Sequence, residues 1–308
     1  MRLMLFTSSI PLVTLSVLLN AFSSSASDFT PKLQLIRAWS NNLAKEQPAN
    51  YPFRVQYERG HKSFTYLAVQ HENKIGSSTF KAIQGALEER SYEVVVMEGF
   101  PRSEGFNSAQ MIEWAKSDGS DGFFQGGETS FLIQQAQTRR IPFVGGEIDD
   151  VDLKSEAIKA GYTELDLLYF YFARQVPQLI RDGTLKTTSI EESYEKFMKK
   201  EMQELKVKSQ KIPSYASFLD WYMRKNATQF SVQSMTSEVV APLCEGTLFT
   251  QKLSGLIGVN RDRFIVKTIA EVLNRYNKVL VVYGGSHWVT QSGVFKDWFG
   301  SPKGVLGL

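Results

Sequence analysis

The sequence predicts an α/β protein with a mainly parallel sheet flanked by helices and with a helical insertion in its second half. Four short, continuous apolar runs are typical of strands that are buried on both faces of a parallel sheet. Segments with helical spacing lie between these runs, and the one long stretch without a strand pattern precedes the fourth run. Strands that alternate with helices predict a parallel sheet covered by helices.

The first 26 residues have the features of a signal peptide. Arg2 precedes an uncharged, leucine-rich stretch from 3 to 27 that ends in small residues. A cationic head, an apolar middle and a small-residue exit predict cleavage, here after Ala26. An uncleaved anchor is the alternative, since the stretch is long enough to span a bilayer, but Pro11 argues against it. We expect residues 27–308 to be secreted or periplasmic, without membrane contact after cleavage.

Composition excludes several classes of protein. The chain is 43% hydrophobic and 22% charged, which excludes a disordered protein. Its 35 basic and 32 acidic residues give a net charge of +3, so we expect no nucleic-acid partner. The single cysteine, Cys244, excludes an internal disulfide and a zinc site built from cysteines.

The apolar runs and the helical spacings give the expected elements in order. Strands are expected at 64–69, 94–97, 141–144 and 279–283. Helices are expected at 28–51, 78–90, 127–139 and 261–276, and Asn260 is a suitable N-cap for the last of them.

From about 152 to 255 no strand pattern is present. Amphipathic stripes at 165–176, 190–208 and 215–224 predict helices instead, so residues 27–308 are expected to form a single domain with this helical insertion. The charged segment 190–208 is most simply a solvent-facing helix, and a helical module that binds a partner protein is the alternative.

Polar residues follow the four predicted strands. His71 follows the first strand, Glu98 the second, Glu147 the third and His287 the fourth. Since the carboxyl ends of parallel strands meet at one edge of a sheet, we expect these side chains to lie close together. Asp149 and Asp150, which come next after Glu147, are expected to start a helix.

This set of residues suits two kinds of chemistry. Two imidazoles with a carboxylate are suitable ligands for Zn, Mn or Co, which makes His71, Glu98 and His287 candidate metal ligands. Without a metal, the same groups can act as general acids and bases on a bound water. The sequence has no GxSxG pattern, which excludes a serine hydrolase of the α/β-hydrolase type. It also has no Walker A and no HExxH pattern.

Arg261 is a further candidate. In the first turn of a helix an arginine opposes the helix dipole, so a carboxylate partner or an anionic substrate group would explain its place.

Four short motifs resemble those of the TraB/GumN/TIKI family. Gly284-Gly285-Ser286-His287 matches the second GxxH motif of the family, and Asn260-Arg261-Asp262-Arg263 is similar to its Arg-Asn-Arg motif. Val96-Met97-Glu98 looks like the strand that ends in glutamate. Ala68-Val69-Gln70-His71 keeps the histidine of the first GxxH motif but has alanine in place of glycine.

The resemblance implies a compact α/β fold with a pocket at the strand ends, formed by His71, Glu98, Arg261 and His287. Members of the wider superfamily include metal-dependent proteases, erythromycin esterases and ChaN-like proteins that bind haem iron. It therefore implies a secreted, metal-dependent hydrolase that cleaves a peptide or ester bond in a peptide or small-molecule substrate. Glu98 would be the general base, or Glu147, which is added from its position at a strand end and not from the resemblance, and Arg261 would stabilise the oxyanion. A non-catalytic protein that binds haem, a metal or a peptide signal is the alternative.

Overall fold

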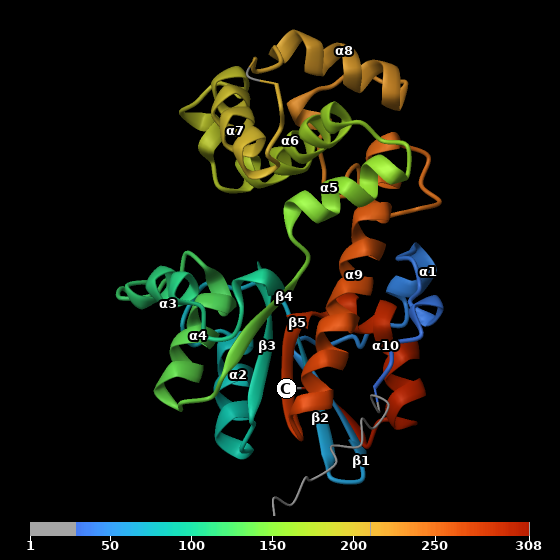
Figure 1. Cartoon of the computed structure of the whole chain (residues 1–308). Coiled ribbons are helices and arrows are strands. Elements are labelled where there is room, and N and C mark those ends of the chain that lie inside the picture. Colours follow the sequence, from blue (N-terminus) through green and yellow to red (C-terminus); the bar gives the residue numbers. More distant parts are fainter. Residues whose placement is uncertain (1–28, 210, 308) are drawn as a thin grey trace, which may run out of the picture.

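The computed structural model describes residues 29–209 and 211–307 (Figure 1). The predicted signal peptide, residues 1–26, lies outside them. Within the described residues, six strands form one sheet in the order β4-β3-β5-β2-β1-β6. The strands are β1 (Phe53–Arg59), β2 (Lys62–Val69), β3 (Val94–Pro101), β4 (Phe143–Glu147), β5 (Lys278–Gly284) and β6 (Gly304–Gly307).

The four strands β4, β3, β5 and β2 are parallel to one another, and they are the four that the apolar runs predict. The expected α/β fold class, with its mainly parallel sheet and flanking helices, is therefore confirmed. Two antiparallel strands at one edge were not predicted: β1 pairs with β2 in a hairpin that turns at Gly60 and His61, and β6 pairs with β1.

Helices cover both faces of the sheet. The helices in this part of the chain are α1 (Asn41–Ala44), α2 (Ser78–Glu89), α3 (Ala109–Lys116), α4 (Gly127–Thr138), α9 (Phe249–Arg275) and α10 (Gly285–Phe299). Helices α2 and α4 pack on one face and α9 and α10 on the other, so each parallel strand is buried on both sides. This burial explains why the strands are apolar without alternation.

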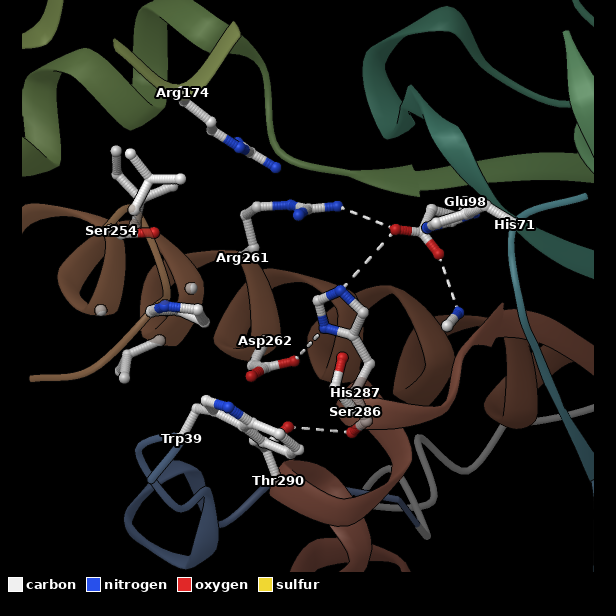
Figure 2. Close-up of a pocket in the computed structure, with 17 residues that line it drawn as sticks. Trp39, His71, Glu98, Arg174, Ser254, Arg261, Asp262, Ser286, His287 and Thr290 are labelled. Atoms are coloured by element: carbon white, nitrogen blue, oxygen red, sulfur yellow. Dashed lines mark hydrogen bonds and ion pairs between the residues drawn. The ribbon is translucent and has the colours of Figure 1, made fainter. Parts of the chain in front are cut away.

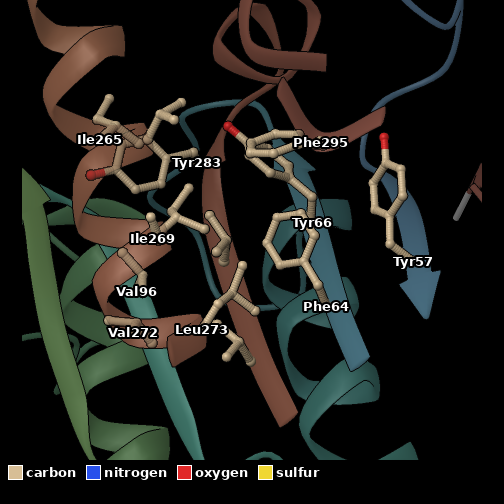
Figure 3. Close-up of a cluster of buried hydrophobic side chains, with 14 of the residues drawn as sticks. Tyr57, Phe64, Tyr66, Val96, Ile265, Ile269, Val272, Leu273, Tyr283 and Phe295 are labelled. Atoms are coloured by element: carbon tan, nitrogen blue, oxygen red, sulfur yellow. The ribbon is translucent and has the colours of Figure 1, made fainter. Parts of the chain in front are cut away.

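Successive strand residues contribute to the two cores in turn. In β5, Tyr283 packs with Ile265 and Ile269 of α9, as Figure 3 shows, and Val281 belongs to the same core. Val282, between them, packs on the opposite face with Ile83 of α2. The alternation follows from the two-residue period of a strand.

The insertion is a separate helical layer above the carboxyl ends of the strands (Figure 1). Its helices are α5 (Asp150–Lys159), α6 (Glu164–Arg181), α7 (Ile190–Glu204) and α8 (Tyr215–Asn226). They enclose an aromatic core of their own around Phe172, Tyr194, Phe218 and Trp221. Asp149 precedes the first residue of α5, as expected.

The predicted start of the last long helix is wrong. Helix α9 begins at Phe249, so Asn260 is not its N-cap and Arg261 lies near its middle. The first half of α9 packs into the core of the insertion through Leu253 and Ile257, and the second half packs on the sheet. Polar residues interrupt the apolar pattern between the two cores, which makes the middle of the helix look like its beginning.

The helix expected at 28–51 is also wrong. In the described part of this segment, only a short 3₁₀ turn (Leu33–Leu35) and the four-residue α1 are helical. The segment packs along α10 instead: Phe29 lies edge-on against Trp298, and the N–H of Arg37 donates to the carbonyl of Thr290. Contacts with α10 therefore hold this segment in place of the backbone hydrogen bonds that a helix would form within it.

No helix within residues 29–209 and 211–307 is long and apolar enough to cross a membrane.

Candidate functional site

Four of the five predicted site residues line one cavity at the carboxyl ends of the parallel strands (Figure 2). His71 follows β2, Glu98 lies in β3, Arg261 comes from α9 and His287 from the first turn of α10. The cavity has a volume of about 250 Å³. Glu147, the fifth, ends β4 and lines a second cavity, to which Arg261 also contributes.

Glu98 lies at the centre of the polar contacts. Its Oε1 lies 3.2 Å from Nη2 of Arg261 and 3.7 Å from Nε2 of His287. Its Oε2 accepts a hydrogen bond of 2.8 Å from the N–H of Gly284. Burial raises the pKa of this carboxyl, but His287, Arg261 and His71 outweigh burial, so the net pKa is lowered and Glu98 is ionised at neutral pH.

Both site histidines are held at Nδ1 by a carboxylate. Nδ1 of His71 lies 2.6 Å from Oε1 of Glu128, and Nδ1 of His287 lies 2.6 Å from Oδ1 of Asp262. Glu128 and Asp262 are both buried. A hydrogen bond at Nδ1 fixes the orientation of the ring and leaves Nε2 for chemistry in the cavity.

The two carboxylates raise the pKa of their histidines. The hydrogen bond to Glu128 raises the pKa of His71 to about 9. Burial lowers the pKa of His287, but Asp262 and Glu98 raise it more, so the net pKa is raised. The centre of the site therefore favours positive charge.

Gly284 marks the point on which the three side chains converge. A Cβ built on Gly284 would lie 3.4 Å from Oε2 of Glu98 and 3.9 Å from both Nε2 of His71 and Cδ2 of His287. The φ of Gly284 is −54°, which any residue adopts. The glycine is therefore needed for the space that it leaves and not for its backbone conformation.

Two of the three guanidinium nitrogens of Arg261 bind carboxylates. Its Nε and Nη2 donate to the two oxygens of Glu147 at 2.9 and 2.8 Å, and Nη2 also contacts Glu98. The carboxylate partner expected for Arg261 is thus present, although the helix-dipole argument for it does not apply in the middle of α9. Both oxygens of Glu147 face Arg261.

The donor types at this site fit a divalent transition metal. Each imidazole has the carboxylate partner that metal-bound histidines usually have. With both imidazoles neutral, the charges of Arg261 and Arg174 would not balance the carboxylates of the site, so a divalent cation would be electrostatically favoured. These carboxylates are Glu98, Glu128, Glu147 and Asp262. Among the described residues, no three His, Cys, Asp or Glu side chains lie in a ready-made metal-binding arrangement, so binding would need side-chain adjustment.

The amino terminus of α10 also faces the cavity. Gly284, Ser286 and His287 line it, and the N–H groups of the first helical turn have no partner inside the helix. Such N–H groups and the helix dipole favour negative charge. This end of α10 is therefore a suitable place for an oxyanion.

Two residues of the site escaped the sequence analysis. Asp262 lies beside Arg261 in the arginine motif, and this position is the one feature of the sequence that could have indicated a role in the site. Glu128 lies in the first turn of α4, where an acidic residue is explained by the helix dipole alone. Its partner, His71, is 57 residues away, so only the fold shows the pair.

Comparison with known proteins gave no relative: no family model, no curated protein and no solved structure matches this chain. The resemblance to the TraB/GumN/TIKI family therefore rests on the motif residues alone.

Proposed function

We propose that this protein is a hydrolase that cleaves an ester or peptide bond in the cavity at the strand ends. One observation carries the proposal: two histidines, each fixed at Nδ1 by a buried carboxylate, converge with Glu98 around Gly284. Two oriented imidazoles beside an ionised carboxylate can transfer protons to and from a reacting water. The TraB/GumN/TIKI-like motifs support the same activity.

His287 is the general base in this proposal. When His287 is neutral, Asp262 keeps the ring proton on Nδ1, so Nε2 can take a proton from a water molecule in the cavity. Because the pKa of His287 is raised, this neutral form becomes more abundant as pH rises. Glu98 lies 3.7 Å from that nitrogen, and its lowered pKa makes it a better acceptor for orienting the water than a base.

His71 is the general acid. With a pKa of about 9, its imidazole is protonated at neutral pH and can give its Nε2 proton to the leaving oxygen or nitrogen. The water adds its oxygen to the carbonyl carbon, His287 receives one proton, and His71 supplies the proton that the leaving group needs. The two imidazoles then exchange protons with solvent before the next cycle.

The developing oxyanion would be stabilised by the free N–H groups at the start of α10. Arg261 is less available than expected, because Glu147 and Glu98 already accept from it. In this proposal Glu147 fixes Arg261, and Arg261 in turn fixes Glu98.

In a metal-assisted form of the reaction, His71, Glu98 and His287 would hold a divalent transition metal. The Nε2 atoms of the two histidines would then be ligands and would not transfer protons, because both Nδ1 atoms face carboxylates. A bound Mn, Co or Zn ion would supply a more acidic water and polarise the carbonyl. Elemental analysis of the natively purified protein, before and after dialysis against a chelator, tests for the ion. Loss of the same ion from the H71A and H287A variants would identify its ligands.

Alanine variants test the proposed activity. His71→Ala, Glu98→Ala and His287→Ala should each lower turnover of ester and peptide substrates by at least about 100-fold, the usual contribution of general acid–base groups. His61→Ala is the matched control, because His61 lies in the exposed turn between β1 and β2. Melting temperatures show that each variant is folded. Activity that survives all three site substitutions contradicts the proposal.

The alternative of a haem-binding protein has a direct test. Titration of the purified protein with haemin should give no saturable change in the haem absorbance band if the protein is a hydrolase. A band that saturates and that depends on His71 or His287 would favour the alternative.

A further inference from the structure

Arg174 lies in the candidate site, and no carboxylate of the described residues pairs with it. It projects from α6 of the helical insertion towards Arg261, as Figure 2 shows. It lines the cavity that holds His71, Glu98 and His287, and it also lines two further cavities. Arg174 is thus the residue at which these three cavities meet.

The two guanidinium groups of the site differ in their partners. Arg261 is bound by Glu147 and Glu98. Within the described residues, no hydrogen bond or ion pair joins Arg174 to another side chain, and its own side chain is open to solvent. The protein atoms around Arg174 remove part of its hydration, and this partial desolvation and the charge of Arg261 lower its pKa. An anion bound to Arg174 would relieve both effects.

Carboxylates limit where this anion can lie. Asp149, Asp150 and Glu204 line the second cavity and would repel it. The first and third cavities meet at Arg174, Val240 and Pro242. The first cavity also has carboxylates, but Glu98 is paired with Arg261 and Asp262 with His287. The third cavity has Glu238, together with the cationic Arg181. The anion therefore belongs on the side of Arg174 that faces these two cavities.

The lining of the first cavity indicates the shape of its ligand. Val240, Pro242 and Ile257 form an apolar wall, while the histidines and Glu98 form a polar group elsewhere on the surface of the cavity. Its volume of about 250 Å³ is below the ~300–1,000 Å³ of most ligand pockets. The ligand is therefore small, with an apolar body between two polar ends.

We propose that Arg174 binds an anionic group of the substrate, a carboxylate or a phosphate, and that the enzyme prefers small esters or amides with such a group at the end remote from the scissile bond. This inference rests on the proposed function for the position of the scissile bond. Arg174 is then a specificity-determining residue, supplied by the insertion, for chemistry at the strand ends.

Paired ester probes test the preference. The 4-nitrophenyl monoesters of succinic, glutaric and adipic acid carry a free carboxylate at three lengths, and their methyl diesters are neutral counterparts. A phosphonate-bearing ester of the preferred length shows which anion is favoured. We expect kcat/KM to be about 10- to 100-fold higher for the charged member of the best pair, the range expected for hydrogen bonds to a charged group.

Substitutions of Arg174 identify the source of the preference. Arg174→Gln should remove the preference through a rise in KM for the charged probe, and Arg174→Lys should retain part of it, because lysine keeps the charge but not the forked geometry. Arg224→Gln is the matched control: Arg224 lies on α8 of the same insertion and pairs with Asp220 on the surface. This variant should keep the full preference.

The outcomes separate this inference from the proposed function. Equal turnover of charged and neutral probes by the wild type, or a preference that Arg174→Gln retains, overturns the role of Arg174. Absence of turnover with every probe contradicts hydrolysis. In that case the shift in melting temperature caused by glutarate, compared with the shift caused by the neutral glutaramide, tests anion binding by Arg174 separately. Stabilisation by glutarate that is lost in Arg174→Gln supports anion binding, and any other pattern overturns it.

Discussion

Oδ1 of Asp262 accepts hydrogen bonds from two side chains of α10, at 2.6 Å from Nδ1 of His287 and at 2.7 Å from Nε2 of Gln291. His287 and Gln291 are one turn apart, so a single oxygen from α9 fixes the face of α10 that borders the cavity. Asp262 is only 4% exposed, which protects these bonds from competition with water. The orientation of His287 is therefore built into the packing of the two helices.

Asp262→Asn should lower kcat by about 10²- to 10⁴-fold, because the amide cannot stabilise the imidazolium and no longer selects the tautomer with a free Nε2. Asp297→Asn is the control, since Asp297 lies near the other end of α10 and pairs with the exposed Lys32. Steady-state rates and circular dichroism of both variants are the measurements. A fully active Asp262→Asn enzyme would show that His287 is not the base.

Substitution by alanine should lower the activity but not the stability at Gly284, and should lower the stability at Gly285. A methyl group at Gly284 would lie between Glu98 and the two histidines at ordinary contact distances, so the variant should fold normally but lose turnover and metal binding. A methyl group at Gly285 would overlap the ring of Tyr51, so the ring or the backbone would have to move. This rearrangement should lower the free energy of unfolding by about 1–3 kcal/mol.

Thermal melts and activity measurements on both variants test this pair. If Gly284→Ala retains wild-type turnover, the reaction does not use the space between the three side chains.

Much of the fold could be predicted because burial leaves a clear mark on the sequence. The parallel strands are apolar on both faces, as Val281 and Val282 show, and their order along the chain brings His71, Glu98 and His287 to one edge of the sheet. The β1 strand was missed although Val55 and Tyr57 are fully buried, because Arg54 and Gln56 between them break the continuous apolar run.

The parts that escaped prediction depend on contacts between distant segments. Helix α9 serves two cores, and where it passes between them its sequence is polar and contains Gly258, so its middle resembles a helix start. Glu128 and Arg174 look like ordinary charged residues of helices. Only the placement of α4 and of the insertion around the strand ends gives these two side chains a place in the site.

The His71–Glu128 pair should make stability depend on pH. The pKa of His71 is 6.5 in an unperturbed chain and about 9 in the folded protein, so the folded state binds the proton more tightly. The stabilisation is complete below pH 6.5 and is lost as pH rises from 6.5 through 9. The effect should be modest, because the His71 side chain is 69% exposed and solvent screens the pair.

Melting temperatures of the wild type and of Glu128→Gln between pH 6 and pH 9.5 measure this contribution. The two curves should differ most at the acidic end and converge towards pH 9.5. Glu113→Gln is a control for loss of an exposed acidic group, because Glu113 pairs with Lys116 on the surface. A constant difference between wild type and Glu128→Gln across this range would contradict the assignment.

Glu147 has two possible roles, and one substitution separates them. As the general base expected from the sequence, Glu147 would be needed for proton transfer, and Glu147→Gln would abolish activity and remove the acidic limb of the pH–rate profile. As the residue that fixes Arg261, it acts through the two hydrogen bonds of 2.9 and 2.8 Å. Glutamine can then accept only one of these bonds and carries no charge.

The geometry favours the second role, because both oxygens of Glu147 are occupied by Arg261 and the carboxylate lines a different cavity from the histidines. Glu147→Gln should therefore destabilise the protein by about 1–3 kcal/mol, the usual effect of weakening a buried charged hydrogen bond. Turnover should fall only in part, and the pKa values of the pH–rate profile should stay unchanged, because His287 and His71 still transfer the protons. A profile that loses its acidic limb in this variant would restore Glu147 as the base.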